Sequence, residues 1–168
     1  MRRHDRGGDG RLRVMRVIAR MNVGGPALQV TGLVEELDAE RFDHRLFTGS
    51  VGPGEADYLD LRAPDLPHTV VQGLGRSPQP LDDLRALREL RAAMRSFRPH
   101  VVHTHTAKAG VLGRAAARSA GVPALVHTFH GHLLHGYFSP AVTATRRVVT
   151  RARARSTCTT PAVTAGEK

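Results

Sequence analysis

Hydrophobic residues along this chain alternate between two patterns. Short runs rich in valine, leucine and isoleucine predict strands, and longer segments with apolar residues every three or four positions predict helices. The predicted strands are residues 12–21, 44–48, 68–72, 100–106 and 124–129. Helical spacing appears at 26–40, 81–97 and 107–120, and residues 51–67 form a turn-rich connection with room for a short helix. Strands that alternate with helices predict an α/β fold with a doubly wound parallel sheet in a single domain.

Two of the predicted helices carry an apolar stripe that should face the sheet. In residues 26–40 the stripe consists of Leu28, Leu33, Val34 and Leu37. In residues 81–97 it consists of Leu81, Leu84, Leu87, Leu90, Met94 and Phe97. The second helix also begins with acidic residues and has Arg95 near its end, which suits the helix dipole.

The two ends of the chain lack these patterns. We expect residues 1–11 to form a disordered basic leader and residues 12–144 to form the folded domain. Residues 145–168 are rich in arginine, threonine and alanine, so we expect a frayed or disordered tail. No run of about 18 apolar residues occurs, so no membrane-spanning helix is expected.

Composition narrows the classes of protein to consider. The formal net charge of +10 favours solubility, a phosphate-bearing substrate or contact with an anionic membrane surface. The sequence has no zinc finger, basic zipper or aromatic RNA-binding motif, so no nucleic-acid partner is expected. The single cysteine excludes an internal disulfide. We therefore expect a cytoplasmic protein, with peripheral contact to the inner face of the membrane as a further possibility.

A glycine turn, 22-NVGGPA-27, follows the first predicted strand and precedes the first predicted helix. Gly24 and Gly25 would let a ligand approach the backbone, and the helix N-terminus would attract a phosphate. The turn is neither a G-x-G-x-x-G fingerprint nor a P-loop. A tight strand-to-helix turn without a ligand explains it equally well.

Histidines gather at the ends of the last two predicted strands, in 103-HTHT-106 and 127-HTFHGHLLH-135. Strand alternation places His103 and His105 on one face of the sheet. It also separates His127 from His130, which leaves the sheet next to Gly131. Because ligands of open parallel sheets bind beyond the carboxyl ends of the strands, His130 is the candidate site residue and His127 is expected to pack beneath it.

A metal site is the weaker explanation of these histidines. His130, His132 and His135 could converge on a zinc ion in a loop. However, no Asp or Glu occurs from residue 101 to residue 166, and no H-E-x-x-H motif is present. We therefore predict no metal, and a histidine-based metal protein is the least favoured hypothesis.

A cationic side chain begins the predicted helix at 107–120. Lys108, with Arg114 one or two turns later, could bind an anionic acceptor. A solvated helix start is the alternative explanation of Lys108.

Three segments together resemble a known family: NVGGPA, VVHTHTAKAGVLGRAAA and VHTFHGHLLHGYF. They are similar to the N-terminal half of retaining glycosyltransferases with the GT-B fold. The nearest type is the family-four group of bacterial enzymes that build polysaccharides and glycolipids. The resemblance extends over about residues 12–144, and H-T-H-T-x-K-A-G with T-F-H-G is its most specific part.

The resemblance implies a fold, a reaction and roles for individual residues. Two Rossmann-like domains would face each other across a cleft, with the acceptor bound mainly by the N-terminal one and the nucleotide-sugar donor by the other. Gly24 and Gly25 would lie by the donor diphosphate, and His130 would be the catalytic residue that contacts the donor sugar. The acceptor or substrate-binding candidates are Lys108, His105, Thr106 and Gly131. The acceptor would be a sugar, a lipid-linked molecule or another small molecule, and transfer would retain anomeric configuration without a cofactor or obligatory metal.

The sequence departs from the family after His135. Nothing there resembles the second domain, its basic donor-phosphate clamp or its paired glutamates. We therefore expect a truncated or frame-disrupted product, or a half that needs a separate C-terminal partner chain, and we expect the isolated chain to be inactive. A non-catalytic module of the same fold that binds a sugar phosphate or a partner is the alternative.

Overall fold

A five-stranded parallel sheet organises the protein in a computed structural model, which describes residues 10–75 and 77–130. The strands are β1 (Leu12–Ile18), β2 (Phe42–Thr48), β3 (His68–Val70), β4 (Val101–His105) and β5 (Ala124–Thr128). Their order in the sheet is β3-β2-β1-β4-β5, and every neighbouring pair is parallel. The predicted doubly wound α/β sheet is thus confirmed, and the strand order reverses between β1 and β4.

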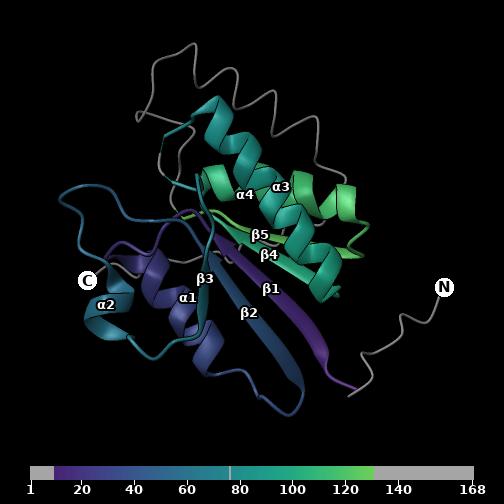
Figure 1. The fold of residues 1–168 in the computed structure, drawn as a ribbon. Helices are drawn as coiled ribbons and strands as arrows, with labels where there is room; N and C mark the ends of the chain where they lie inside the picture. The colour runs from purple at the N-terminus through teal and green to yellow at the C-terminus, as the bar shows by residue number, and fades with distance from the viewer. Residues whose placement is uncertain (1–9, 76, 131–168) are drawn as a thin grey trace, which may run out of the picture. The chain divides into compact units, whose positions relative to one another are not determined.

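Helices cover both faces of this sheet (Figure 1). They are α1 (Gly25–Glu35), α2 (Tyr58–Arg62), α3 (Pro80–Phe97) and α4 (Ala107–Ala120). Side chains alternate along β1, so that Met15 and Val17 pack with α3 and α4, while Ile18 packs with α1 and α2. We call the α3/α4 side the back face and the α1/α2 side the front face.

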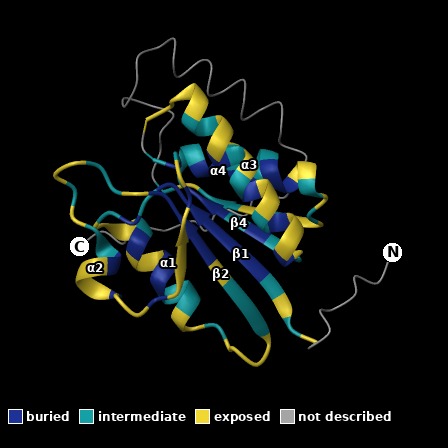
Figure 2. Ribbon diagram, viewed as in Figure 1, coloured by how far each residue is buried: buried dark blue, intermediate teal, exposed yellow. Residues whose placement is uncertain are grey.

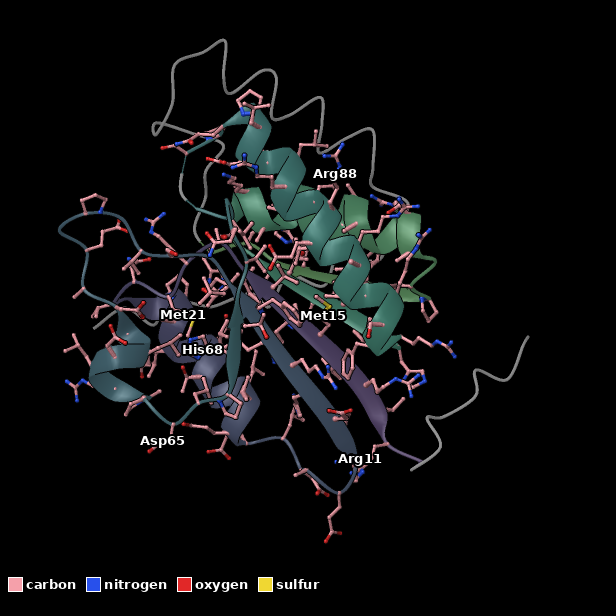
Figure 3. All side chains as sticks on the ribbon, viewed as in Figure 1. Arg11, Met15, Met21, Asp65, His68 and Arg88 are labelled. Atoms are coloured by element: carbon pink, nitrogen blue, oxygen red, sulfur yellow. The ribbon has the colours of Figure 1, made fainter. Side chains whose placement is uncertain are left out.

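The sheet interior is aliphatic, as the scarcity of aromatic residues predicts. Figure 2 shows the middle of β1 buried between the two helical layers. Met15 belongs to the back-face core and Met21 to the front-face core, and Figure 3 labels both. Within residues 10–130, no helix combines the length and apolarity needed to cross a bilayer.

The apolar face predicted for the first helix is correct at Val34, which packs against the front-face core, but wrong at Leu28 and Leu37. Helix α1 buries Ala27, Val30 and Thr31, whereas Leu28 is 63% exposed and Leu37 lies beyond the end of the helix. The segment GPALQVTGLVE carries apolar residues on several sides, so spacing alone did not fix its orientation. Small residues face the sheet because Ile18, Met21 and Leu46 already fill the space between α1 and the strands.

The stripe predicted for the longest helix is correct only in its second half. Leu90, Met94 and Phe97 are buried, but Leu81 is 75% exposed and Leu84 is 41% exposed. The first turn of α3 packs through polar groups instead. The backbone of Gly73 lies so close to Asp82 that a Cβ atom at residue 73 would overlap with it.

Candidate functional site

The carboxyl edge of the sheet collects the turns that follow β1, β4 and β5. The backbone N–H of Ala19, just after β1, donates to Thr106 Oγ1 at 3.3 Å, which joins the ends of β1 and β4. The register of β4 and β5 places His105 beside Thr128, so that His130 follows directly at this edge. Most residues predicted for the site therefore belong to one edge, at the switch point of the sheet.

Three histidines form a connected row on the front face. The rings of His103 and His105 lie 4.1 Å apart between centroids, and His105 Nδ1 lies 3.1 Å from His130 Nε2. Nε2 of His103 lies 2.8 Å from Thr128 Oγ1. The predicted sharing of faces, His103 with His105 and Thr128 with His130, is confirmed by these contacts.

Burial keeps this row uncharged at neutral pH. Desolvation lowers the pKa of His103 to about 4 and that of His105 to about 2, with further lowering by neighbouring histidines and by Arg16. Burial also lowers the pKa of His130. His105 is 0% exposed, whereas His130 is only partly buried. Of these two hydrogen-bonded histidines, His130 is therefore the one that can meet a ligand.

A buried arginine beneath the row was not predicted from the sequence. Arg16, in the middle of β1, is 3% exposed and pairs in register with His103. One of its terminal nitrogens donates to the carbonyl of Leu33 in α1 at 3.0 Å. An arginine within an apolar strand run, LRVMRVI, was the signal that could have pointed to it. Its charge disfavours protonation of the nearby histidines, because two adjacent cations in a desolvated setting repel each other.

The glycine turn after β1 leads into the N-terminus of α1. Gly24 caps the helix with an extended backbone, and both Gly24 and Gly25 are exposed. A Cβ atom built on Gly25 would meet no heavy atom within 4 Å, so internal packing does not require a glycine there. By contrast, a Cβ at Gly49 would overlap with the carbonyl of Leu74. The space beside Gly25 is open, as binding of a ligand to the backbone would need.

The turn between β4 and α4 is strained at Thr106. Its φ of 66° and ψ of 162° fall in a region that a β-branched residue seldom adopts. Such a conformation costs roughly 1–3 kcal/mol and persists where surrounding contacts enforce it. The hydrogen bond from Ala19 to Thr106 is one such contact. Thr106 therefore holds the ends of β1 and β4 together.

Lys108 is engaged within the protein rather than solvated. Its ammonium donates to the carbonyls of Gly73 at 3.0 Å and Ser77 at 2.7 Å, and it pairs with Asp83 at 2.6 Å. The side chain is 10% exposed. It joins the start of α4 to the β3–α3 connection, and a ligand would compete with these three oxygen atoms. Contact between Lys108 and an acceptor stays a prediction.

His127 lies on the back face, away from the row. Its Nδ1 is 2.9 Å from Thr104 Oγ1, and its ring meets Phe129 edge-on at 4.3 Å. Helix α4 approaches so closely that a Cβ at Gly110 would overlap with the imidazole. Burial lowers the pKa of His127 to about 4, with a smaller effect from Arg114. His127 is thus packed within the fold, as predicted, through Thr104, Phe129 and α4, and its place directly beneath His130 stays a prediction.

Some of the predicted residues fall outside the described part of the chain, and Arg114 is occupied within α4. Gly131, His132 and His135 lie outside the described residues, as do the predicted leader up to residue 9 and the predicted tail. Arg114 donates from Nε to the carbonyl of Gly110 at 2.5 Å. In the part of the chain that the structure describes, no group of three or more His, Cys, Asp or Glu side chains could hold a metal ion.

Comparison with known proteins supports the sequence-based resemblance. The model of a family described as "Glycosyl transferase 4-like domain" matches residues 24–165. One curated relative is UDP-Gal:alpha-D-GlcNAc-diphosphoundecaprenol alpha-1,3-galactosyltransferase from Escherichia coli, which is 41% identical over 99 residues. That match covers 58% of this chain but only 24% of the relative's length.

Solved structures share the fold. Sucrose-phosphate synthase from Thermosynechococcus elongatus superimposes with a TM-score of 0.61 at 19% identity. A UDP-N-acetylglucosamine 2-epimerase superimposes with a TM-score of 0.60 at 21% identity. Each match covers 84% of this chain and 40% of the other. At these identities the likeness concerns the fold alone.

Proposed function

Because the chain belongs to the glycosyl transferase 4-like domain family, we propose that it is the acceptor-side domain of a GT-B enzyme that transfers a sugar from a nucleotide-sugar with retention. The observation that carries this proposal is the His105–His130 pair at the switch-point edge of the sheet. There, a neutral, partly exposed imidazole can meet a sugar hydroxyl or a phosphate oxygen without bringing a charge.

The donor is a UDP-sugar and the acceptor a sugar linked through diphosphate to a polyprenol. The Escherichia coli relative has both in its name, and 41% identity over 99 residues supports extending its substrate class to this chain. The formal charge of +10 suits both diphosphates, and it suits peripheral contact with the anionic membrane in which a polyprenol acceptor would reside.

Separate parts of the edge serve different groups of the substrates. Backbone N–H groups at Gly24 and Gly25, with the N-terminus of α1 behind them, face the donor diphosphate. His130 hydrogen-bonds the donor sugar near the reacting carbon. Thr106 and Lys108 keep the β4–α4 turn and the β3–α3 connection in place around it. Front-side attack of the acceptor hydroxyl, aided by the leaving phosphate, retains configuration.

The donor site is shared with residues outside this domain. Stabilising a departing diphosphate needs preorganised positive groups. In this proposal the described residues contribute backbone N–H groups at Gly24 and Gly25 to that task. A second Rossmann-like domain, in the same polypeptide or in a partner chain, would supply the rest. The isolated chain should therefore bind UDP-sugar weakly and should not turn it over.

A binding experiment tests this proposal on the chain itself. We expect the chain to bind N-acetylglucosaminyl-diphospho-polyprenol in detergent more tightly than the corresponding polyprenyl phosphate, measured by isothermal titration calorimetry. His130→Ala should weaken this preference, whereas His68→Ala, at the far edge of the sheet on β3, should not. Equal binding of the two lipids would refute the acceptor class. A preference that is unchanged in His130→Ala would remove His130 from the site.

A further inference from the structure

His105 is the most enclosed ring in the histidine row, and its two nitrogens have different surroundings. Nδ1 lies 3.1 Å from Nε2 of His130, with the rings stacked at an interplanar angle of 30°. Nε2 is buried and has no hydrogen-bond partner among the described residues. His103 packs against the same ring and is itself held by Thr128, so His105 cannot turn easily to exchange these positions.

Only two proton arrangements are compatible with this pair. A hydrogen bond between neutral imidazoles needs one N–H and one bare nitrogen, because each ring carries a single proton. If His130 donates from Nε2, then His105 must carry its proton on its own Nε2. If His105 donates from Nδ1, then His105 Nε2 is bare and His130 must carry its proton on Nδ1.

Burial favours the second arrangement. In the first, the N–H of His105 Nε2 would be enclosed without an acceptor, and orphaned buried N–H groups are rarer than under-satisfied acceptors. In the second, the enclosed atom is a lone pair.

The back face provides an independent example of the same arrangement. The hydroxyl of Thr104 donates to the carbonyl of Val126 at 3.3 Å, which uses its only proton. Both contacts of Thr104 Oγ1 are satisfied together only when His127 donates from Nδ1 across the 2.9 Å contact. His127 Nε2 is then a buried bare nitrogen, as we infer for His105.

We propose that His105 is a positioning residue that holds His130 in the Nδ1–H tautomer, so that His130 presents an uncharged N–H donor to a ligand oxygen. His130 Nε2 accepts a hydrogen bond from His105 Nδ1–H and is thereby occupied, which leaves Nδ1–H of His130 for the ligand. His130 then acts by donating a hydrogen bond to a sugar hydroxyl or phosphate oxygen and does not act as a proton-accepting base. The identity of that ligand rests on the proposed function, whereas the tautomer does not.

Nuclear magnetic resonance of the whole chain tests the tautomer directly. Long-range ¹H–¹⁵N correlation of ring-labelled histidine distinguishes a protonated from a bare ring nitrogen, and substitution of each histidine assigns the signals. At neutral pH we expect His130 to show a protonated Nδ1 and a bare Nε2, and His105 to show the same pattern. A protonated Nε2 on His130 in the unaltered chain would overturn the proposal, whatever the variants do.

Substitutions then separate positioning from mere packing. His105→Asn keeps an N–H donor near the place of Nδ1 and should preserve the Nδ1–H form of His130. His105→Leu fills similar space without a donor and should allow His130 to take up the Nε2–H form. Thr104→Val on the back face is the matched control and should leave His130 unchanged. If His130 keeps its tautomer in folded His105→Leu, then His105 does not determine it.

The proposed function and this inference fail in different ways. Loss of the lipid preference with the expected tautomer intact would overturn the substrate class alone. An Nε2–H tautomer on His130 with the lipid preference intact would overturn the inference alone. Both measurements use the same purified chain.

Discussion

The two faces of β4 and β5 carry histidines that share one property but differ in their surroundings. On the front face, His105 has a pKa of about 2, and on the back face His127 has a pKa of about 4, both mainly because of burial. However, His127 is enclosed by Thr104, Phe129 and the backbone of α4, whereas His105 leads to the partly exposed His130. A lowered pKa thus marks burial, and only the connection to an accessible ring nitrogen marks a candidate site.

The difference between the faces follows from which helices cover them. On the back face, α4 packs directly over β4 and β5, with Val102 and Leu125 in its core. The front-face core is built from α1 and α2 against β1 and β2. Val126, which shares the front face of β5 with Thr128, is 42% exposed. The front of β5 is therefore less covered at Val126 than its back is at Leu125, and the histidine row lies beside it.

Lowering the pH should reduce the stability of the fold through histidines on both faces, and this is the largest effect that we expect. His103, His105 and His127 have folded-state pKa values of about 4, 2 and 4, below the ordinary value of 6.5. As pH falls below about 6.5 the unfolded chain binds protons that the folded chain excludes, so stability is highest above that pH and is lost toward pH 4. Each histidine contributes at most about 1.4 kcal/mol per pH unit. Urea denaturation at several pH values measures this slope.

Single substitutions assign that slope to a face. His105→Asn and His127→Asn should each reduce the slope of the free energy of unfolding against pH by the contribution of about one proton. Val126→Ala, at an exposed position on β5, removes no titratable group and should leave the slope unchanged. A slope that stays the same in His127→Asn would mean that the back-face imidazole titrates normally in the folded protein.

The next largest effect should distinguish the faces by function. In a complete transferase that contains this domain, His130→Ala removes a preorganised hydrogen-bond donor and should lower kcat by about 10²–10³-fold. His127→Asn should lower the free energy of unfolding but leave kcat almost unchanged, because His127 does not reach the edge. Steady-state kinetics with a UDP-sugar, together with urea denaturation, measures both. A large loss of kcat in folded His127→Asn would contradict the division into two faces.

Local patterns determined what could be predicted of this division. The alternation of β4 and β5 correctly assigned His103, His105, His127 and His130 to their faces, because a period of two needs no tertiary information. The predicted face of α1 was only partly correct, since Val34 packs against the core but Ala27, Val30 and Thr31 rather than Leu28 face the sheet.

Contacts between distant segments were beyond such patterns. The carbonyls and carboxylate that hold Lys108 come from residues 73–83, and the carbonyl that binds Arg16 comes from α1. Arg13 and Arg16 lie three residues apart in β1, so alternation sends them to opposite faces but does not tell which is buried. Both cases depend on packing between elements, which fixes partners only after the sheet has formed.

Adding a methyl group at Gly110 on the back face should have a smaller effect on stability, and a second substitution at His127 should relieve it. Gly110→Ala places a Cβ atom against the ring of His127 and should reduce the free energy of unfolding by about 1–3 kcal/mol. The matched control is Gly32→Ala within α1, where a Cβ would meet no heavy atom within 4 Å and should stabilise the helix by about 0.5–1 kcal/mol. In a His127→Ala background, Gly110→Ala should cost much less, and additivity of the two changes would show that they do not touch.

The smallest expected effect is a difference in stability between substitutions of two adjacent β5 residues that lie on opposite faces of the sheet. Leu125 packs against the back-face core, so Leu125→Ala should reduce the free energy of unfolding by about 2 kcal/mol, the low end for a leucine that is only partly buried. Val126 points to the front, so Val126→Ala should cost less than about 1 kcal/mol, since less apolar surface leaves water there. Urea denaturation of both variants at pH 7.5, well above the lowered pKa values of His103, His105 and His127, separates packing from the titration of these three residues. Equal costs would mean that the front of β5 is covered as fully as its back, and the histidine row would then lack the access to solvent on which its proposed role depends.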